Sequence, residues 1–414
     1  MDSRTGTPVV GMVGAGQLAR MTHQAAVALG QSLRVLADTA NDPAALVARD
    51  VTVGSYRDLD TLRSFATGCD VLTFDHEHVP APHLRALEAD GVTVRPSPDA
   101  LLHAQDKLVM RRRLAELDLP VPPFTAVSSV ADAVRFGAQH GWPCVLKATR
   151  GGYDGRGVWM LNTPTGARRV VAELLAAGTP LLVEQCVPML GELAAVVARS
   201  PFGQGAAWPV VQTVQRDGIC VEVLAPAPGV PAELAVAAHE LALRIATDLD
   251  VVGVLAVELF HTAGGLVVNE LAMRPHNSAH WTIEGSRTSQ FEQHLRAVLD
   301  YPLGSPSLAA PVTVMANVLG ATSRPAMAVD ERLHHLFARF PDARVHLYGK
   351  PERPRRKIGH VTLLGDRLAD VRPRAQLAAA WLATGCWPDR WRPSRNPSRN
   401  PLGDPLGDDV TSPQ

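Results

Sequence analysis

The stretch VLAVELFHTAGGLVVNELAMRPHNSAHWT, residues 254–282, predicts a β-hairpin that leads into a polar loop. Two strongly apolar runs flank a turn at 263–265, and pairing about Gly264 places Glu258 opposite Glu270. Like charges that face each other across a sheet are destabilising, so we expect a dication between the carboxylates rather than two solvated side chains. Hard oxygen donors favour magnesium over zinc.

Polar residues beside and after this pair extend the predicted site. The same pairing places Phe260 opposite Val268, and the neighbouring Asn269 offers a further oxygen ligand. The polar run that follows contains Arg274, His276, Asn277, Ser278 and His280. Such a run directly after a hydrophobic strand is typical of a functional loop on a rigid scaffold. It suits a small oxyanion, although either histidine alone fits a structural role equally well.

The densest glycine cluster lies upstream, in PCVLKATRGGYDGRGVWML, residues 143–161. One strand ends at Lys147, and a second begins at Val158. Glycines remove the Cβ obstruction and let backbone N–H groups approach phosphate oxygens. Because no helix and no G-K-[ST] follow, this is not a Walker A loop. We expect a phosphate-binding hairpin, and the alternative is a flexible surface hairpin.

Two further segments are ambiguous on their own. LLVEQCVPMLGE, residues 181–192, runs from a strand into a proline-containing linker that suits an adenine edge and ribose hydroxyls, but an ordinary strand end fits as well. GKPERPRRKIGHVT, residues 349–362, is a strong basic cluster. It fits either a clamp for a substrate phosphate or a solvated turn.

The N-terminal VVGMVGAGQLARM, residues 9–21, has the G-x-G-x-x-A spacing of a dinucleotide-binding turn. Asp38 follows at the distance expected for a ribose contact. An oxidoreductase that uses this fingerprint is one hypothesis. It leaves the paired glutamates and the glycine-rich hairpin unexplained.

Alternating strand-like and helix-like runs in the first hundred residues predict a parallel sheet with helices on both faces. The expected strands are 9–13, 33–37, 50–54, 70–74 and 92–96, and the helices are 17–29, 58–67 and 81–90. Later expected elements are helices at 100–120, 231–247, 289–299 and 374–384, a hairpin at 251–271 and a β-rich module at 311–365. The end of the chain is rich in Pro, Gly, Asp and Ser, which predicts a disordered tail.

Composition excludes several classes of protein. The 414 residues are 46% hydrophobic and 20% charged, as in globular proteins, and 40 basic residues balance 41 acidic ones. We therefore expect no general nucleic-acid-binding surface. Five dispersed cysteines without a C-x-x-C pair indicate reduced thiols and a cytoplasmic protein. No secretion signal and no uninterrupted apolar span is present, so we expect no membrane association.

Taken together, these segments resemble an ATP-grasp ligase, and specifically the 5-(carboxyamino)imidazole ribonucleotide synthetases of purine biosynthesis. The resemblance rests on GAGQLARM, TFDHEHVP, KATRGGYDGRGVW, QRDGI, RPHNSAHWT and RRKIGHVT, which occur in the family's order. It implies a mixed α/β and α+β fold: a Rossmann-like N-terminal domain (1–104), an ATP-grasp domain (105–305) with a lid (124–188), and a small β-rich C-terminal domain (306–388) before the tail (389–414).

The resemblance also implies a reaction. ATP, bicarbonate and 5-aminoimidazole ribonucleotide would give the N5-carboxylated ribonucleotide, ADP and phosphate through carboxyphosphate. The implied cofactors are ATP and Mg²⁺, with Mn²⁺ as an alternative, and the implied assembly is a homodimer. Related ligases, such as formate-dependent glycinamide ribonucleotide transformylase, share the first half of the pattern, and a non-catalytic regulator of the same fold is a further hypothesis.

Site roles carried over from the family fall into four groups. ATP would contact Lys107, Lys147, Gly152, Tyr153, Asp154, Gly155, Arg156, Gly157, Val158, Glu184, Gln185, Cys186, Val187, Glu192, Gln212, Asn269 and Glu270. Magnesium would bind Glu258 and Glu270. Catalytic roles fall to Lys147, Arg274, His276 and Asn277. The ribonucleotide would contact Gln17, Asp75, Tyr153, Arg156, Arg274, Ser278, Lys350, Arg356 and Lys357.

Four positions depart from the family's usual residues. Alanines stand at Ala15 and Ala19 where glycine is usual, Asp75 replaces glutamate, and Lys107 often is arginine. None of these changes removes a predicted metal ligand or a predicted phosphate contact.

Overall fold

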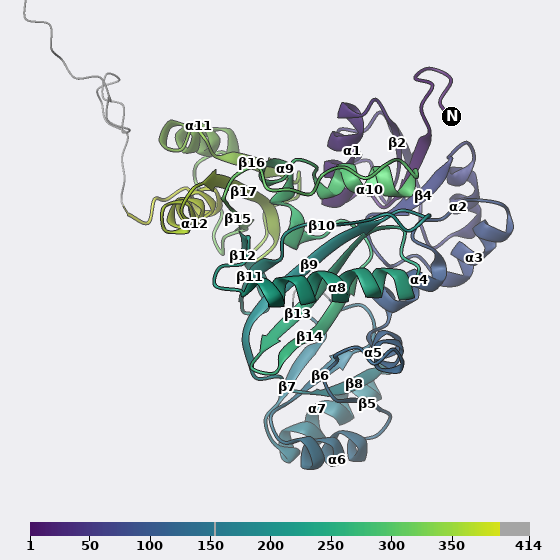
Figure 1. Cartoon of the computed structure of the whole chain (residues 1–414), viewed down its shortest axis with the longest axis vertical. Helices are drawn as coiled ribbons and strands as arrows, with labels where there is room; N and C mark the ends of the chain where they lie inside the picture. The colour runs from purple at the N-terminus through teal and green to yellow at the C-terminus, as the bar shows by residue number, and fades with distance from the viewer. Residues whose placement is uncertain (153–154, 390–414) are drawn as a thin grey trace, which may run out of the picture.

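A parallel four-stranded sheet builds the N-terminal part of the computed structural model, which describes residues 1–152 and 155–389 (Figure 1). Its order is β3-β2-β1-β4, and its strands are β1 (Val9–Val13), β2 (Ser32–Ala37), β3 (Asp50–Val53) and β4 (Val71–Phe74). The helices between them are α1 (Gln17–Ala28), α2 (Leu59–Ala66) and α3 (Ala81–Ala89). Strands β1 and β4 are completely buried, as expected where helices cover both faces of a parallel sheet.

The strand predicted at 92–96 does not form. The chain makes only an isolated parallel bridge there, between Val94 and Leu72. Two prolines follow, Pro96 and Pro98, and proline cannot donate a hydrogen bond to a strand ladder. The parallel sheet therefore ends at β4 on this side.

The single helix predicted at 100–120 is divided at Asp106 into α4 (Pro98–Gln105) and α5 (Lys107–Glu116). The Asp106 carboxylate accepts hydrogen bonds from two backbone N–H groups of the next turn, at 3.0 and 3.2 Å. This N-cap satisfies donors that a helix start leaves free, and so begins a new helix. As a result, Lys107 stands on the first turn of α5.

A small antiparallel sheet of order β5-β8-β6-β7 lies at the bottom of Figure 1. We call it the lid sheet because it falls within the predicted lid, residues 124–188. Its elements are β5 (Phe124–Val127), α6 (Val130–His140), β6 (Cys144–Ala148), β7 (Val158–Leu161), α7 (Pro164–Ala176) and β8 (Leu181–Gln185). Lys147 pairs with Leu182, and Val145 pairs with Glu184. Lys147 and Glu184 are therefore diagonal neighbours on one face.

A nine-stranded antiparallel sheet spans the rest of the described chain, in the order β14-β13-β9-β11-β12-β15-β17-β16 with β10 on β9. Its strands are β9 (Met189–Arg199), β10 (Gly205–Ala207), β11 (Val211–Arg216), β12 (Ile219–Ala225), β13 (Gly253–Thr262), β14 (Gly265–Ala272), β15 (Val312–Leu319), β16 (Arg344–Leu347) and β17 (Lys357–Gly365). The three C-terminal strands thus extend the central sheet through the pairing of β12 with β15.

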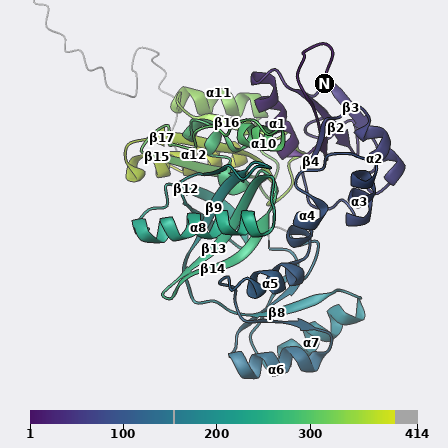
Figure 2. The same ribbon diagram turned by 45° about the vertical axis from the view of Figure 1, so that its right-hand side comes forward.

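Helices cover this sheet, and Figure 2 shows α8 lying along it. They are α8 (Ala232–Asp248), the 3-10 turn η1 (Asn277–Ala279), α9 (Thr282–Gly285), α10 (Gln290–Val298), α11 (Val329–Arg339) and α12 (Leu368–Thr384). Helix α12 begins six residues before the predicted start at 374 and includes Pro373. Its buried face, which includes Val371 and Ala375, packs in one cluster with Val314 and Val361, so packing outweighs the proline penalty.

No helix within residues 1–152 and 155–389 has the length and apolar character needed to cross a membrane.

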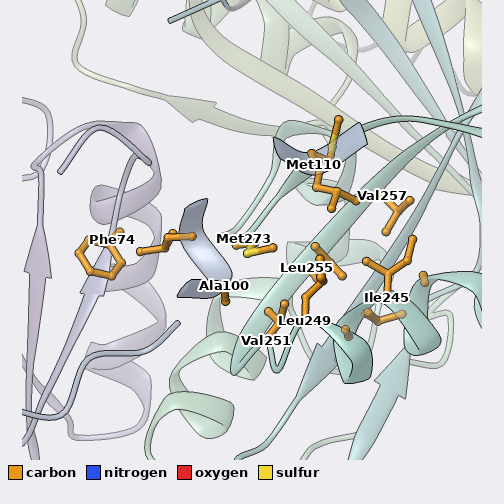
Figure 3. Packing of buried hydrophobic residues seen from close by; sticks show 14 of the residues in the cluster. Phe74, Ala100, Met110, Ile245, Leu249, Val251, Leu255, Val257 and Met273 are labelled. Atoms are coloured by element: carbon orange, nitrogen blue, oxygen red, sulfur yellow. The ribbon is translucent and has the colours of Figure 1, made fainter. Parts of the chain in front are cut away.

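One hydrophobic core joins the N-terminal sheet to the central sheet. It includes Phe74 of β4, Ala100 of α4, Met110 of α5 and Leu255 of β13. In Figure 3, α4 lies between Phe74 and the side chains of β13. Burial of this apolar surface fixes the two sheets relative to each other, and so positions the loops that leave them.

Acid is expected to weaken this junction through His294 of α10. Its Nδ1 accepts a hydrogen bond from the N–H of Val254 at 3.1 Å, and its Nε2 lies 2.7 Å from Oγ1 of Thr73. Burial lowers the pKa of His294 to about 4, whereas an unfolded histidine titrates near 6.5. The unfolded chain therefore binds the proton more readily, and the free energy of unfolding should fall by up to about 1.4 kcal/mol per pH unit as the pH drops from 6.5 towards 4.

Urea unfolding at pH 7.5 and pH 5.5 measures this loss. The matched comparison is His294→Gln, whose amide keeps a donor and an acceptor but does not titrate. We expect the variant to lose less stability on acidification than the parent protein. Equal losses in both proteins would contradict the role of His294.

Candidate active site

The hairpin of β13 and β14 places the two predicted metal-binding carboxylates face to face. Glu258 lies directly opposite Glu270 in the ladder, as predicted. Burial, the carboxylate of Glu270 and the carboxylate of Glu192 together raise the pKa of Glu258 to about 7. Either a proton or a cation has to offset this repulsion, so the pair fits a dication.

The register of this hairpin differs from the prediction. Phe260 pairs with Val267 rather than with Val268, because the turn contains two residues and not three. The register shifts between Leu259, which pairs with Val268, and Glu258, which pairs with Glu270. Asn269 is therefore the extra residue of a β-bulge. The bulge restores the pairing of the two glutamates and directs Asn269 beside them.

Two lysines and an amide surround the carboxylates. Lys107 Nζ lies 2.5 Å from Oε1 of Glu270. Lys147 Nζ donates to Oδ1 of Asn269 at 3.1 Å, and the Asn269 amide nitrogen donates to Glu258 at 3.3 Å. Across residues 1–152 and 155–389, no group of three or more His, Cys, Asp or Glu side chains is arranged to hold a metal. A dication at the glutamate pair would therefore need further oxygen ligands from a bound molecule, and nucleotide phosphates supply them.

A buried ion-pair network joins the lid sheet to α5. Lys147 Nζ lies 2.8 Å from one oxygen of Glu184, and Arg111 Nε donates to the other at 2.7 Å. Burial lowers the pKa of Lys147. Burial alone would raise the pKa of Glu184, but Lys147 and Arg111 outweigh it and lower that pKa. The Glu184 carboxylate is thus engaged within the protein, and its contact with adenine or ribose stays a prediction.

The predicted dinucleotide turn already holds an anion that belongs to the protein. The Asp75 carboxylate accepts hydrogen bonds from the N–H groups of Gly16 at 2.6 Å and Ala19 at 2.8 Å. A Cβ at Gly16 would lie 2.3 Å from Asp75, so this close approach requires glycine. Pyrophosphate binds the same N–H groups at a helix N-terminus, and Asp75 would compete with it. This geometry argues against the oxidoreductase hypothesis, while the ribonucleotide contact of Asp75 stays a prediction.

Two other predicted ribonucleotide contacts meet from opposite ends of the chain. Lys350 Nζ donates a hydrogen bond to Oε1 of Gln17.

Burial, then Arg274 and then Lys357 lower the pKa of His276 to about 3. Lys357, at the start of β17, therefore acts electrostatically on the predicted catalytic loop.

The loop after β14 holds two predicted catalytic side chains in fixed positions. Arg274 Nε lies 2.8 Å from a carboxylate oxygen of Glu77, which follows β4. His276 Nδ1 lies 2.9 Å from Oγ of Ser278, and its Nε2 lies 3.7 Å from Oε1 of Glu258. With its lowered pKa, this imidazole is neutral at physiological pH.

Amide side chains brace the same loop. The amides of Asn277 and Asn317 donate to each other at 3.0 and 2.8 Å, which links the loop to β15. Gln290 accepts from the N–H of His276 at 2.7 Å and donates to its carbonyl oxygen at 2.9 Å. The Asn277 amide is therefore engaged within the protein, and its contact with bicarbonate stays a prediction.

The remaining predicted contacts with ATP and with the ribonucleotide lie on several separate parts of the chain. The glycine-rich turn between β6 and β7 carries Gly152, Gly155, Arg156 and Gly157, and Val158 is the first residue of β7, while Tyr153 and Asp154 lie outside the described residues. Gln185, Cys186 and Val187 lie at the end of β8 and directly after it, and Glu192 and Gln212 lie on the paired strands β9 and β11. Arg356 lies directly before β17.

Four residues at the site were not predicted: Glu77, Arg111, Gln290 and Asn317. Arg111 had a usable signal, because it stands four residues after Lys107 and therefore on the same helix face. Glu77 lies three residues after the end of a predicted strand, 70–74. Gln290 and Asn317 have ordinary sequence surroundings, and only the fold brings them to the loop.

Comparison with protein families divides the chain into three matched segments. A ribonucleotide synthetase preATP-grasp domain matches residues 8–105, an ATP-grasp domain matches residues 112–291, and a phosphoribosylaminoimidazole carboxylase C-terminal domain matches residues 313–374. The predicted fold class is therefore confirmed.

Individual relatives agree along nearly the whole chain. The N5-carboxyaminoimidazole ribonucleotide synthase of Mycobacterium tuberculosis is 64% identical over 389 residues, which cover 94% of this chain and 91% of the relative. The enzyme of Synechococcus elongatus is 40% identical, over 92% of this chain and 95% of the relative. A crystal structure of the Aspergillus clavatus enzyme with ADP and 5-aminoimidazole ribonucleotide has a TM-score of 0.81 and 30% identity, over 91% of this chain and 98% of its own. The chain belongs to the N5-carboxyaminoimidazole ribonucleotide synthase family of ATP-grasp ligases.

Proposed function

We propose that the chain carboxylates 5-aminoimidazole ribonucleotide with bicarbonate and ATP, giving N5-carboxyaminoimidazole ribonucleotide, ADP and phosphate in purine biosynthesis. The observation that carries this proposal is the opposed pair Glu258 and Glu270 with Lys107 and Lys147 beside it. Two carboxylates that can bind a metal ion, with two lysine ammonium groups beside them, suit a nucleoside triphosphate bound together with that metal ion. The names of the relatives and the ADP and ribonucleotide complex of one of them support the choice of substrates.

In the first step a bicarbonate oxygen attacks the γ-phosphorus of ATP, the bond to the β–γ bridging oxygen breaks, and carboxyphosphate and ADP form. Lys107 and Lys147 would neutralise charge on the phosphates, because phosphoryl transfer depends chiefly on positioning and electrostatic stabilisation. Glu258 and Glu270 would hold Mg²⁺ or Mn²⁺, which supplies further charge neutralisation when bound.

In the second step the exocyclic amine of the ribonucleotide attacks the carboxyl carbon of the anhydride, or CO₂ released from it. The bond from that carbon to the phosphate oxygen breaks, and the departing phosphate takes up the proton that the amine loses. Arg274, fixed by Glu77, would hold the anionic oxygens of bicarbonate and of the new carboxylate. His276 is neutral and would act as a hydrogen-bond donor rather than as a cation. Gln17 and Lys350 would bind the ribonucleotide.

We further propose a cytoplasmic homodimer that acts only on small molecules, with neither nucleic acid nor membrane as a partner. The balanced charge of the chain and its dispersed cysteines support this setting.

ATP turnover with magnesium and bicarbonate, measured as ADP release with and without 5-aminoimidazole ribonucleotide, tests the proposed reaction. We expect ADP release to depend on the ribonucleotide. ADP release at the same rate without it, or a preference for formate with glycinamide ribonucleotide, would refute the assignment.

Replacement of one metal-binding carboxylate tests the glutamate pair. Glu270→Gln should reduce turnover by about a thousandfold or more, because charge stabilisation is the main contribution to this chemistry, while circular dichroism shows an unchanged fold. The exposed Glu233→Gln on α8 is the matched control. Full activity in Glu270→Gln would remove the metal assignment.

Loss of the Arg274 partner tests the bicarbonate site. Glu77→Gln should lower kcat by about tenfold to a hundredfold, because small displacements of a positioning group are costly, and should leave the KM for ATP unchanged. Steady-state kinetics provide both constants, and Glu88→Gln, on the exposed side of α3, is the control. A parent-like kcat in Glu77→Gln would show that Arg274 needs no such support.

A further inference from the structure

We infer that Arg111 is a positioning residue that couples the phosphate-binding Lys147 to the metal-binding hairpin. The inference rests on the proposed function, since it assigns a role within the same nucleotide site. Arg111 lies on α5, one helical turn after Lys107, and its side chain is fully buried. It touches the two parts of the site through different nitrogens of one guanidinium group.

The first contact sets the charge that Lys147 presents. Arg111 Nε donates to one oxygen of Glu184 at 2.7 Å, and Lys147 Nζ lies 2.8 Å from the other oxygen. Two cations thus share one carboxylate, and the network keeps one positive charge in excess. Without Arg111, Lys147 and Glu184 would form a neutral pair and leave less net charge for a phosphate. The arginine therefore keeps the network attractive to a nucleotide.

The second contact supports the hairpin. Arg111 Nη2 donates to the backbone carbonyl of Asn269 at 2.7 Å. Asn269 is the bulge residue, and its side chain contacts both Lys147 and Glu258. Because the guanidinium donors form a rigid fork, the contact with Glu184 and the contact with the bulge are fixed relative to each other. Phosphate binding and metal binding are therefore geometrically linked.

The cost of burying Arg111 supports a positioning role over a purely structural one. Its third nitrogen, Nη1, is buried and has no hydrogen-bond partner among the residues that the structure describes. Buried ion pairs often add little stability compared with apolar packing, and an unmade hydrogen bond reduces that stability further. The geometry that Arg111 imposes on Lys147 and Asn269 gives a reason for its presence.

Nucleotide binding by three variants tests this coupling. Arg111→Gln removes the charge, Arg111→Lys keeps the charge but replaces the rigid fork of donors with a single ammonium nitrogen, and Arg112→Gln changes the exposed neighbour on the same helix as a control. Calorimetry with a non-hydrolysable ATP analogue and with adenosine gives the affinities, and magnesium titrations in the presence of the analogue give the metal requirement. Thermal melting by circular dichroism identifies variants that do not fold.

In Arg111→Gln we expect the Kd for the ATP analogue to rise about tenfold or more, with the Kd for adenosine unchanged. In Arg111→Lys we expect near-parent affinity for the analogue but a several-fold higher magnesium concentration at half-saturation. If Arg111 had a structural role alone, its replacement would lower the melting temperature and would change the affinities for the ATP analogue and for adenosine to the same extent. Parent-like affinities and magnesium dependence in the folded variants would overturn the inference.

These measurements are independent of the test of the proposed reaction. They use no ribonucleotide and no turnover, whereas the proposed function fails if the parent protein releases ADP independently of 5-aminoimidazole ribonucleotide. If Arg111→Gln does not fold, the magnesium dependence of Arg111→Lys decides the inference alone. A parent-like value in that variant would overturn it.

Discussion

The repulsion between Glu258 and Glu270 is the constraint around which the site is arranged. A sheet does not favour two acids in direct register, yet here a two-residue turn and a bulge at Asn269 combine to produce that register. Lys107 offsets part of the negative charge from α5, and Lys147 approaches from the lid sheet through Asn269. Three parts of the chain therefore meet at the glutamate pair, and a bound metal nucleotide would complete the charge balance there.

Much of the fold could be predicted from the sequence because its elements have strong local patterns. The alternation of apolar strands and amphipathic helices predicted the N-terminal sheet, and the facing glutamates were evident from the hairpin at 254–282. The errors have local causes that pattern alone does not reveal. A capping aspartate, Asp106, divides one predicted helix, and tertiary packing extends another through Pro373.

The supporting residues of the site were harder to predict because their partners are distant in sequence. Glu77 reaches Arg274 and Asn317 reaches Asn277 only after the N-terminal and C-terminal strands have joined the central part of the molecule. The glycine motif at 14–19 shows the opposite problem, since its local pattern is clear but its ligand is not. Asp75 satisfies the helix N-terminus from within the protein, and nothing in the motif itself indicates this.

The continuity of the central sheet from β14 to β16 has a consequence for how the chain can be divided. The C-terminal unit contributes β15 as the direct neighbour of β12, so a protein shortened at about residue 305 would leave β12 as an unpaired strand edge. Exposed edges of this kind invite pairing between molecules and aggregation. The C-terminal domain matches its family as a separate segment. It nevertheless pairs with β12 and continues the central sheet, so it cannot be treated as a detachable module.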